Sequence, residues 1–95
     1  MRLKIIAVCG FGVGSSMLLK MKVDEMLKKN GVNVNVGTAD FGSSVSEPCH
    51  VIFTSKELEP KISAKVKVPV IPISNFMDLK EIEEKGLEVV KNLLN

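Results

Sequence analysis

The feature that most constrains the fold is a short apolar segment that leads directly into a glycine-rich turn. Residues 4–9 form a nearly continuous apolar run, which is typical of a strand buried on both faces. Three glycines follow at every second position, Gly10, Gly12 and Gly14, and a helical pattern then begins. Glycine permits backbone conformations that turn successive N–H groups toward one point. This strand–turn–helix segment predicts an anion-binding cradle, because a helix N-terminus adds partial positive charge at the same place.

Strand and helix patterns alternate through the rest of the chain. Residues 32–36, 51–53 and 66–73 predict three further strands, with helical spacing between them. Such alternation is typical of an α/β fold, here a four-stranded parallel sheet with helices on both faces. Alternating valines in the second strand, and Pro69 and Pro72 in the fourth, favour edge positions for these two strands. The expected strand order is therefore 2-1-3-4, with an N-terminal phosphate-binding loop after the first strand.

The helices are predicted from apolar spacing and from their terminal residues. The first is expected over residues 15–30, ends at Asn30-Gly31, and has a core stripe of Leu19, Val23, Met26 and Leu27. Ser55 is expected to cap a short helix whose Leu58 and Ile62 face inward. Asp78 and Glu81 predict a capping-box variant at the last helix. That helix is expected to bury Leu79, Ile82, Val89, Val90 and Leu93.

Composition excludes several classes of function. At 95 residues and 45% hydrophobic content, residues 1–95 are expected to form a single domain. The net charge of +2 and the 4% aromatic content argue against nucleic-acid binding. No apolar run approaches the roughly 20 residues that span a bilayer, and no signal peptide is recognisable, so a cytoplasmic location without direct membrane insertion is expected.

Cys9 is the candidate catalytic residue, because it stands at the mouth of the predicted cradle. A helix N-terminus and aimed amides lower a cysteine pKa from about 8.5 into the range of roughly 3.5–7.5 and so favour the nucleophilic thiolate. A phosphoryl group on that sulfur would supply acceptor oxygens for the amides that follow. The phosphate-binding residues are predicted to be Gly10, Phe11, Gly12, Val13, Gly14, Ser15 and Ser16.

Three other interpretations of the glycines fail on specific residues. No lysine stands before the serines, as a nucleotide-binding P-loop requires. The chain is short for a dinucleotide site together with a substrate site. A small tyrosine phosphatase would place arginine where Ser15 stands, and without that guanidinium rapid hydrolysis of a phosphocysteine is not expected. A low-molecular-weight phosphatase-like protein and a redox-sensing thiol protein remain the alternatives to a phosphoryl carrier.

Residues 7–24 closely resemble the IIB component of the bacterial phosphoenolpyruvate-dependent sugar phosphotransferase system. The ascorbate-type branch, within the lactose/cellobiose and galactitol-like IIB group, is the most similar. The resemblance implies that Cys9 accepts phosphate from a histidine of the IIA component. It further implies that Cys9 passes the phosphate to a sugar bound by the membrane permease IIC, and the expected sugar is ascorbate. A cytoplasmic subunit of this kind associates transiently with the permease and needs no cofactor.

Several other residues are candidates for a functional or a structural role. Met17 and Met21 lie one helical turn apart outside the core stripe and, with Lys20, are candidates for a partner interface. Asp40, Ser55 and the pair Ser74-Asn75 are expected near the carboxyl edge of the sheet, most simply as turn or capping groups. The only histidine, His50, is expected at the opposite edge, and Cys49 beside it is interpreted as a core residue that forms no disulfide with Cys9. No metal site is predicted.

Overall fold

The computed structural model describes residues 3–8, 13–32, 34–39 and 49–94, of which residues 13–16 and 94 are described by their backbone alone. The strands are β1 (Lys4–Val8), β2 (Asn35–Ala39), β3 (Val51–Ser55) and β4 (Val70–Ile73). The helices are α1 (Val13–Lys29), α3 (Glu59–Ser63) and α4 (Leu79–Leu94). No helix in these ranges is both long enough and apolar enough to cross a membrane.

The four strands form one sheet in the order β2-β1-β3-β4, and every pair is parallel, as the sequence predicts. Val8 at the end of β1 pairs with Ala39 of β2 and with Thr54 of β3. β1 and β3 are the two interior strands, which explains why almost every residue in them is buried.

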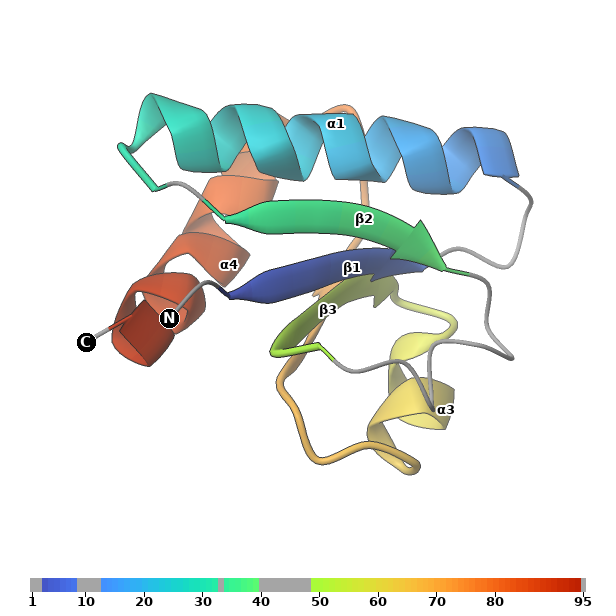
Figure 1. Ribbon diagram of the computed structural model, residues 1–95. Coiled ribbons are helices and arrows are strands. Elements are labelled where there is room, and N and C mark those ends of the chain that lie inside the picture. The colour runs from blue at the N-terminus through green and yellow to red at the C-terminus, as the bar shows by residue number, and fades with distance from the viewer. Residues whose placement is uncertain (1–2, 9–12, 33, 40–48, 95) are drawn as a thin grey trace.

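Helices cover both faces of this sheet (Figure 1). The larger core lies on the face covered by α1 and α4, and Phe53 of β3 is its largest fully buried side chain. The smaller core lies on the other face, where Ile62 of α3 packs with Ile6, Val8 and Ile52. The predicted stripe of α1 is confirmed, since its four residues are at most 1% exposed: Leu19, Val23, Met26 and Leu27.

The end of α1 also explains why β2 begins later than predicted. Gly31 has φ 75°, the left-handed conformation that ends many helices. The N–H of Val32 then donates to the carbonyl of Leu27 at 2.8 Å and is engaged in this cap. The sheet ladder starts only where the Asn35 N–H donates to the Leu3 carbonyl, so Val32 and Val34 are buried but precede the strand.

Two further sequence predictions are corrected at the edge strand and the last helix. β4 covers only four of the predicted residues and includes Pro72, whose carbonyl accepts a hydrogen bond from Lys85 Nζ at 3.2 Å. In α4, Ile82 and Val90 are fully buried and Leu79 and Val89 partly so, but Leu93 is 41% exposed. The close approach to the sheet is made instead by Gly86, which is buried against the ring of Phe53.

Candidate functional site

The carboxyl end of β1 is held in place by a buried side chain of the neighbouring strand. Thr54 of β3 is fully buried, and its hydroxyl donates to the Val8 carbonyl at 2.8 Å. This bond joins the two interior strands at their carboxyl ends, the edge where parallel sheets bind ligands. The hydrogen bond therefore holds the backbone of Val8, the residue that precedes Cys9 in the chain.

The structure describes part of the predicted phosphate-binding segment. Cys9, Gly10, Phe11 and Gly12 lie outside the described residues. Val13–Ser16 form the first turn of α1, so the helix begins two residues earlier than the predicted Ser15. The first N–H groups of a helix have no partner within it, and they bear partial positive charge. No acidic residue stands in this first turn, so no carboxylate of the turn itself offsets that partial positive charge.

Ser55 does not cap a helix, contrary to the sequence prediction. It is the last residue of β3, paired with Ile73 of β4, and it is 9% exposed. The short helix α3 begins instead at Glu59 with Pro60 in its first turn, and Leu58 precedes it without a side-chain cap. Among the described residues, the Ser55 hydroxyl is the buried side-chain oxygen without a hydrogen-bond partner.

The segment after β4 is tied back to α4 by Glu81. One carboxylate oxygen of Glu81 accepts from the Ser74 N–H at 2.8 Å and from Lys85 Nζ at 2.6 Å, and the other accepts from the Asn75 N–H at 3.0 Å. Partial burial alone would raise the pKa of Glu81, but the hydrogen bonds from Lys85, Ser74 and Asn75 prevail and lower it to about 2. Glu81 therefore holds this part of the rim in one conformation as a carboxylate.

The capping box predicted at α4 is confirmed in one half only. Asp78 Oδ1 accepts from the backbone N–H groups of Lys80 and Glu81 at 3.1 and 3.3 Å, as an N-cap residue does. The reciprocal bond is replaced, because the Asp78 N–H donates to the Asn75 carbonyl while the Glu81 carboxylate binds Ser74 and Asn75. The sequence spacing identified Glu81, but not the residues that it binds.

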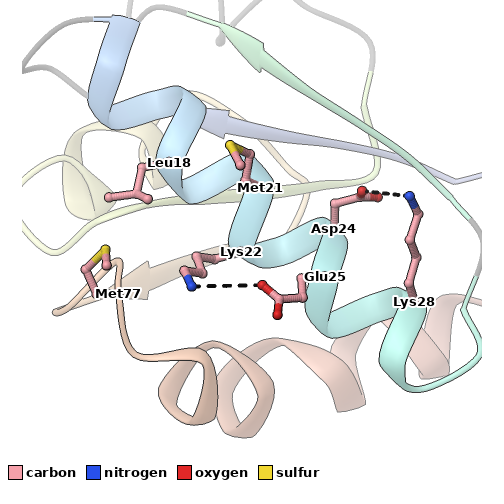
Figure 2. A pocket seen from close by; sticks show the side chains of 7 residues that line it. All are labelled: Leu18, Met21, Lys22, Asp24, Glu25, Lys28 and Met77. Atoms are coloured by element: carbon pink, nitrogen blue, oxygen red, sulfur yellow. Dashed lines mark ion pairs between the residues drawn. The ribbon is translucent and has the colours of Figure 1, made fainter.

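The methionines predicted for a partner interface are exposed on the outer face of α1. Met17 is 43% exposed and Met21 is 61% exposed, whereas Lys20 is half-buried. Met77, which precedes α4 and is 61% exposed, was not singled out by the sequence. Its position depends on the tertiary structure, because it lines the same hollow as Met21 only where the β4–α4 connection faces α1 (Figure 2).

A hollow of about 520 Å³ lies between Met21 and Met77 and is also lined by Leu18 and Lys22. Figure 2 shows the side chains that line it. Farther along α1, the charged residues that line the hollow form two ion pairs: Lys22–Glu25 at 3.9 Å and Lys28–Asp24 at 3.1 Å. Pairs of this exposure contribute little stability. The resulting surface is apolar near the start of α1 and balanced in charge farther along the helix. We call Met17, Leu18, Met21 and Met77 the methionine surface.

Other candidates lie away from this edge or outside the described residues. His50 stands at the amino end of the sheet, where its N–H donates to the Lys4 carbonyl and its Nδ1 accepts from the Lys4 N–H, at 2.8 and 3.0 Å. This confirms its predicted place opposite the carboxyl end of β1. Cys49 is half-buried and packs against the smaller core. Asp40 is not among the described residues, and within those ranges no group of three His, Cys, Asp or Glu residues is placed to hold a metal.

Known proteins are similar to this chain in sequence and in fold. Residues 4–87 match the family model described as the lactose/cellobiose-specific IIB subunit of the PTS system. Ascorbate-specific PTS system EIIB components of Salmonella typhimurium (strain LT2) and Escherichia coli O157:H7 are 34% and 33% identical over 93 residues, which is 96% of this chain and 92% of each relative.

A solved lactose-specific IIB component domain of the phosphoenolpyruvate:carbohydrate phosphotransferase system, from Streptococcus pneumoniae, has the same fold. The TM-score is 0.64 over 99% of this chain and 96% of that one, at 13% sequence identity. The parallel sheet in the order 2-1-3-4 and the near-complete family match agree with the resemblance found in the sequence. The chain therefore belongs to the lactose/cellobiose-type IIB family and is a phosphotransferase subunit of the sugar phosphotransferase system.

Proposed function

We propose that Cys9 carries the phosphoryl group in this IIB subunit, and that residues 1–95 act as a single phosphocarrier domain. The observation that supports this most directly is the first turn of α1, Val13–Ser16, a helix N-terminus that contains no acidic residue. The same segment follows the carboxyl end of β1 after only four residues, 9–12, of which Cys9 is the first. A thiolate and its phosphorylated form both benefit from such donors.

The proposed transfer proceeds in two displacements on phosphorus. The Cys9 thiolate attacks the phosphorus of a phosphohistidine on IIA, the sulfur–phosphorus bond forms, and the nitrogen–phosphorus bond breaks. The imidazole leaves with the electron pair of that bond. A hydroxyl of the sugar bound by IIC then attacks the same phosphorus, its proton passes to a base, and the Cys9 thiolate leaves. The backbone N–H groups of residues 10–16 would bind the phosphoryl oxygens throughout.

The substrate that we propose is ascorbate. The relatives at 33–34% identity are named for ascorbate, and they are covered almost completely by this chain. The implied partners are the IIA protein as donor and the IIC permease with bound sugar as acceptor. We place the subunit in the cytoplasm, with transient association at the permease. The proposed transfer through Cys9 uses no cofactor.

The methionine surface, together with Lys20, is the proposed docking site for the phosphorylated IIA partner. It begins at Met17, directly after the proposed phosphate-binding segment, so a protein that delivers phosphate to Cys9 would contact this side of α1. Flexible methionine side chains adapt to more than one partner, which suits a carrier that must also meet IIC. Met21→Glu is expected to slow phosphorylation of Cys9 by IIA without changing the fold, whereas the matched exposed change Lys28→Glu should have a much smaller effect.

The decisive experiment is intact-mass measurement after incubation with phosphoenolpyruvate and the upstream phosphorelay proteins. We expect the wild-type chain to gain one phosphoryl group. Cys9→Ser should gain none, and Cys49→Ser, which removes the other thiol, should behave as wild type. Failure of the wild type to be phosphorylated, or phosphorylation of Cys9→Ser, would overturn the proposal. Ascorbate is tested separately, by supplying the complete system with ascorbate or lactose and following loss of the phosphoryl group.

The same sample tests the two alternatives that the sequence left open, neither of which the family match favours. A phosphatase-like protein would release phosphate from an aryl phosphate without any partner. A redox-sensing thiol protein would be oxidised at Cys9 by dilute peroxide and would remain unmodified by the phosphorelay. We expect neither result.

A further inference from the structure

Met77 is an exposed apolar side chain whose place depends on the turn between β4 and α4. It lines the hollow together with Met21 of α1, and each of the two side chains is 61% exposed (Figure 2). Met21 is carried by a long helix, whereas Met77 belongs to no helix or strand. The shape of the hollow therefore depends on what holds this turn, residues 74–78.

The backbone of Met77 is held by Asn75. The Met77 N–H donates to Asn75 Oδ1 at 3.0 Å, and the Asp78 N–H donates to the Asn75 carbonyl at 3.0 Å. Phe76, which lies between Asn75 and Met77 in the chain, is partly buried against the larger core. Phe76 thus anchors the turn, while the hydrogen bond from Met77 to Asn75 fixes the direction in which the backbone presents the methionine.

Asn75 is in turn held by Glu81 of α4. The Glu81 carboxylate accepts from the Asn75 N–H at 3.0 Å and from Lys85 Nζ at 2.6 Å. Helix capping does not require the bond to Asn75, because Asp78 already accepts from two N–H groups in the first turn of α4. A chain of hydrogen bonds therefore runs from α4 through Glu81 and Asn75 to the backbone of Met77.

The lining of the hollow indicates what kind of group it would receive. Leu18, Met21 and Met77 supply its apolar part, and the charged residues that line the rest pair with one another along α1. Neither sign of charge is in excess, so the group that fits is an apolar side chain. Met77 follows the carboxyl end of β4, and α1 follows that of β1, so a partner at this edge of the sheet would also cover the hollow.

We infer that Glu81, acting through Asn75, is a positioning residue that holds Met77 for docking of an apolar side chain of the phosphorylated IIA partner, an inference that rests on the proposed function. Neither Glu81 nor Asn75 contacts the phosphoryl group in this role, and no covalent bond is made or broken at either. A turn that is held before the partner arrives need not be ordered during docking, which lowers the free-energy cost of binding. Loss of this hold should weaken binding of IIA and leave the transfer step unchanged.

The test measures the single-turnover rate at which phosphorylated IIA phosphorylates the chain, at increasing concentrations of IIA. We expect Asn75→Ala and Glu81→Gln each to raise the half-saturating concentration of IIA by about three- to tenfold, the effect of one lost hydrogen bond. The maximum rate should stay within about twofold of the parent, because the transfer step is not touched. Asn75→Asp keeps the acceptor oxygen and should restore most of the parent behaviour. Glu84→Gln, an exposed change elsewhere on α4, should alter neither constant.

A double-mutant cycle shows whether Asn75 acts through Met77. In a Met77→Ala background, Asn75→Ala should change the half-saturating concentration by less than about twofold. Equal effects of Asn75→Ala in the two backgrounds would overturn the inference, as would an unchanged half-saturating concentration in Asn75→Ala and Glu81→Gln. A lower maximum rate at an unchanged half-saturating concentration would overturn it too, since the turn would then act on transfer and not on docking. A parent protein that phosphorylated IIA leaves unmodified would instead refute the proposed function.

Discussion

Replacing Glu81 by glutamine tests how the rim of the site is held. The Glu81 carboxylate accepts hydrogen bonds from the Ser74 and Asn75 N–H groups and from Lys85 Nζ, at 2.8, 3.0 and 2.6 Å. Glutamine keeps the shape and one acceptor oxygen, but it loses the charge and places an NH₂ group opposite one of these donors. The segment that includes Met77 should therefore become less rigidly attached to α4.

The magnitude follows from the pKa of Glu81. Its value is lowered from 4.5 to about 2, because the hydrogen bonds from Lys85, Ser74 and Asn75 outweigh the opposing effect of partial burial. A shift of this size corresponds to at most ~3–4 kcal/mol of stability at neutral pH. Ser74 and Asn75 are exposed and Lys85 is 37% exposed, so screening by solvent reduces the expected contribution to about 1–2 kcal/mol.

The sign of the pH dependence is fixed by the direction of the shift. A carboxyl whose pKa is lower in the folded state stabilises the protein fully above its unfolded pKa, here 4.5. The contribution is lost as the pH falls toward the folded pKa of about 2, and more than half of it should be gone by about pH 3. Glu81→Gln should abolish this part of the acid sensitivity.

Urea unfolding at pH 7 and at pH 3 measures the effect. We expect Glu81→Gln to be less stable than wild type by about 1–2 kcal/mol at pH 7, and the difference to shrink by more than half at pH 3. Glu84→Gln, an exposed change on the same helix, should have little effect at either pH. A difference between wild type and Glu81→Gln that is absent at pH 7, or that is equally large at pH 3, would refute the reasoning.

Two further predictions concern the buried contacts of β3. Thr54→Val removes the hydroxyl that donates to the Val8 carbonyl and should reduce the free energy of unfolding by about 1–2 kcal/mol. Thr38→Val, a control on the edge strand where the residue is exposed, should not reduce it. Equal effects of the two changes would contradict the structural role of the Thr54 bond. Gly86→Ala would place a Cβ 2.4 Å from two atoms of the buried Phe53 ring. Alanine has the higher helix propensity, but the steric clash should outweigh it. Thermal unfolding should therefore show a net loss of stability of about 1–2 kcal/mol. In a Phe53→Leu background the same change should be much less harmful, and a stabilising effect of Gly86→Ala in the wild type would show that the contact is not tight.

Residue patterns alone were enough to predict the four-stranded sheet and its two interior strands. Continuous apolar runs identified the two interior strands, because a strand covered on both faces has no place for polar side chains. Alternating valines in the second strand and two prolines in the fourth identified the edge strands. In such a sheet, an edge strand tolerates a partly solvent-exposed face or a missing N–H donor better than an interior strand does. The spacing of the apolar residues in α1 predicted its buried face, because residues three and four apart lie on the same side of a helix. The family resemblance rested on this segment and on the cysteine after it.

Tertiary structure decided which distant groups meet. Ser55 stands before a predicted helix in the sequence, but its pairing with Ile73 makes it the last residue of β3, and burial there leaves its hydroxyl without a partner. Glu81 has the spacing of a capping residue, yet the path of the chain after β4 brings Ser74 and Asn75 to its carboxylate. Gly86 has no pattern that marks it, and its small size matters only because α4 crosses the ring of Phe53. Local spacing fixes which face of an element is apolar, but contacts between elements depend on packing that no short stretch of sequence encodes.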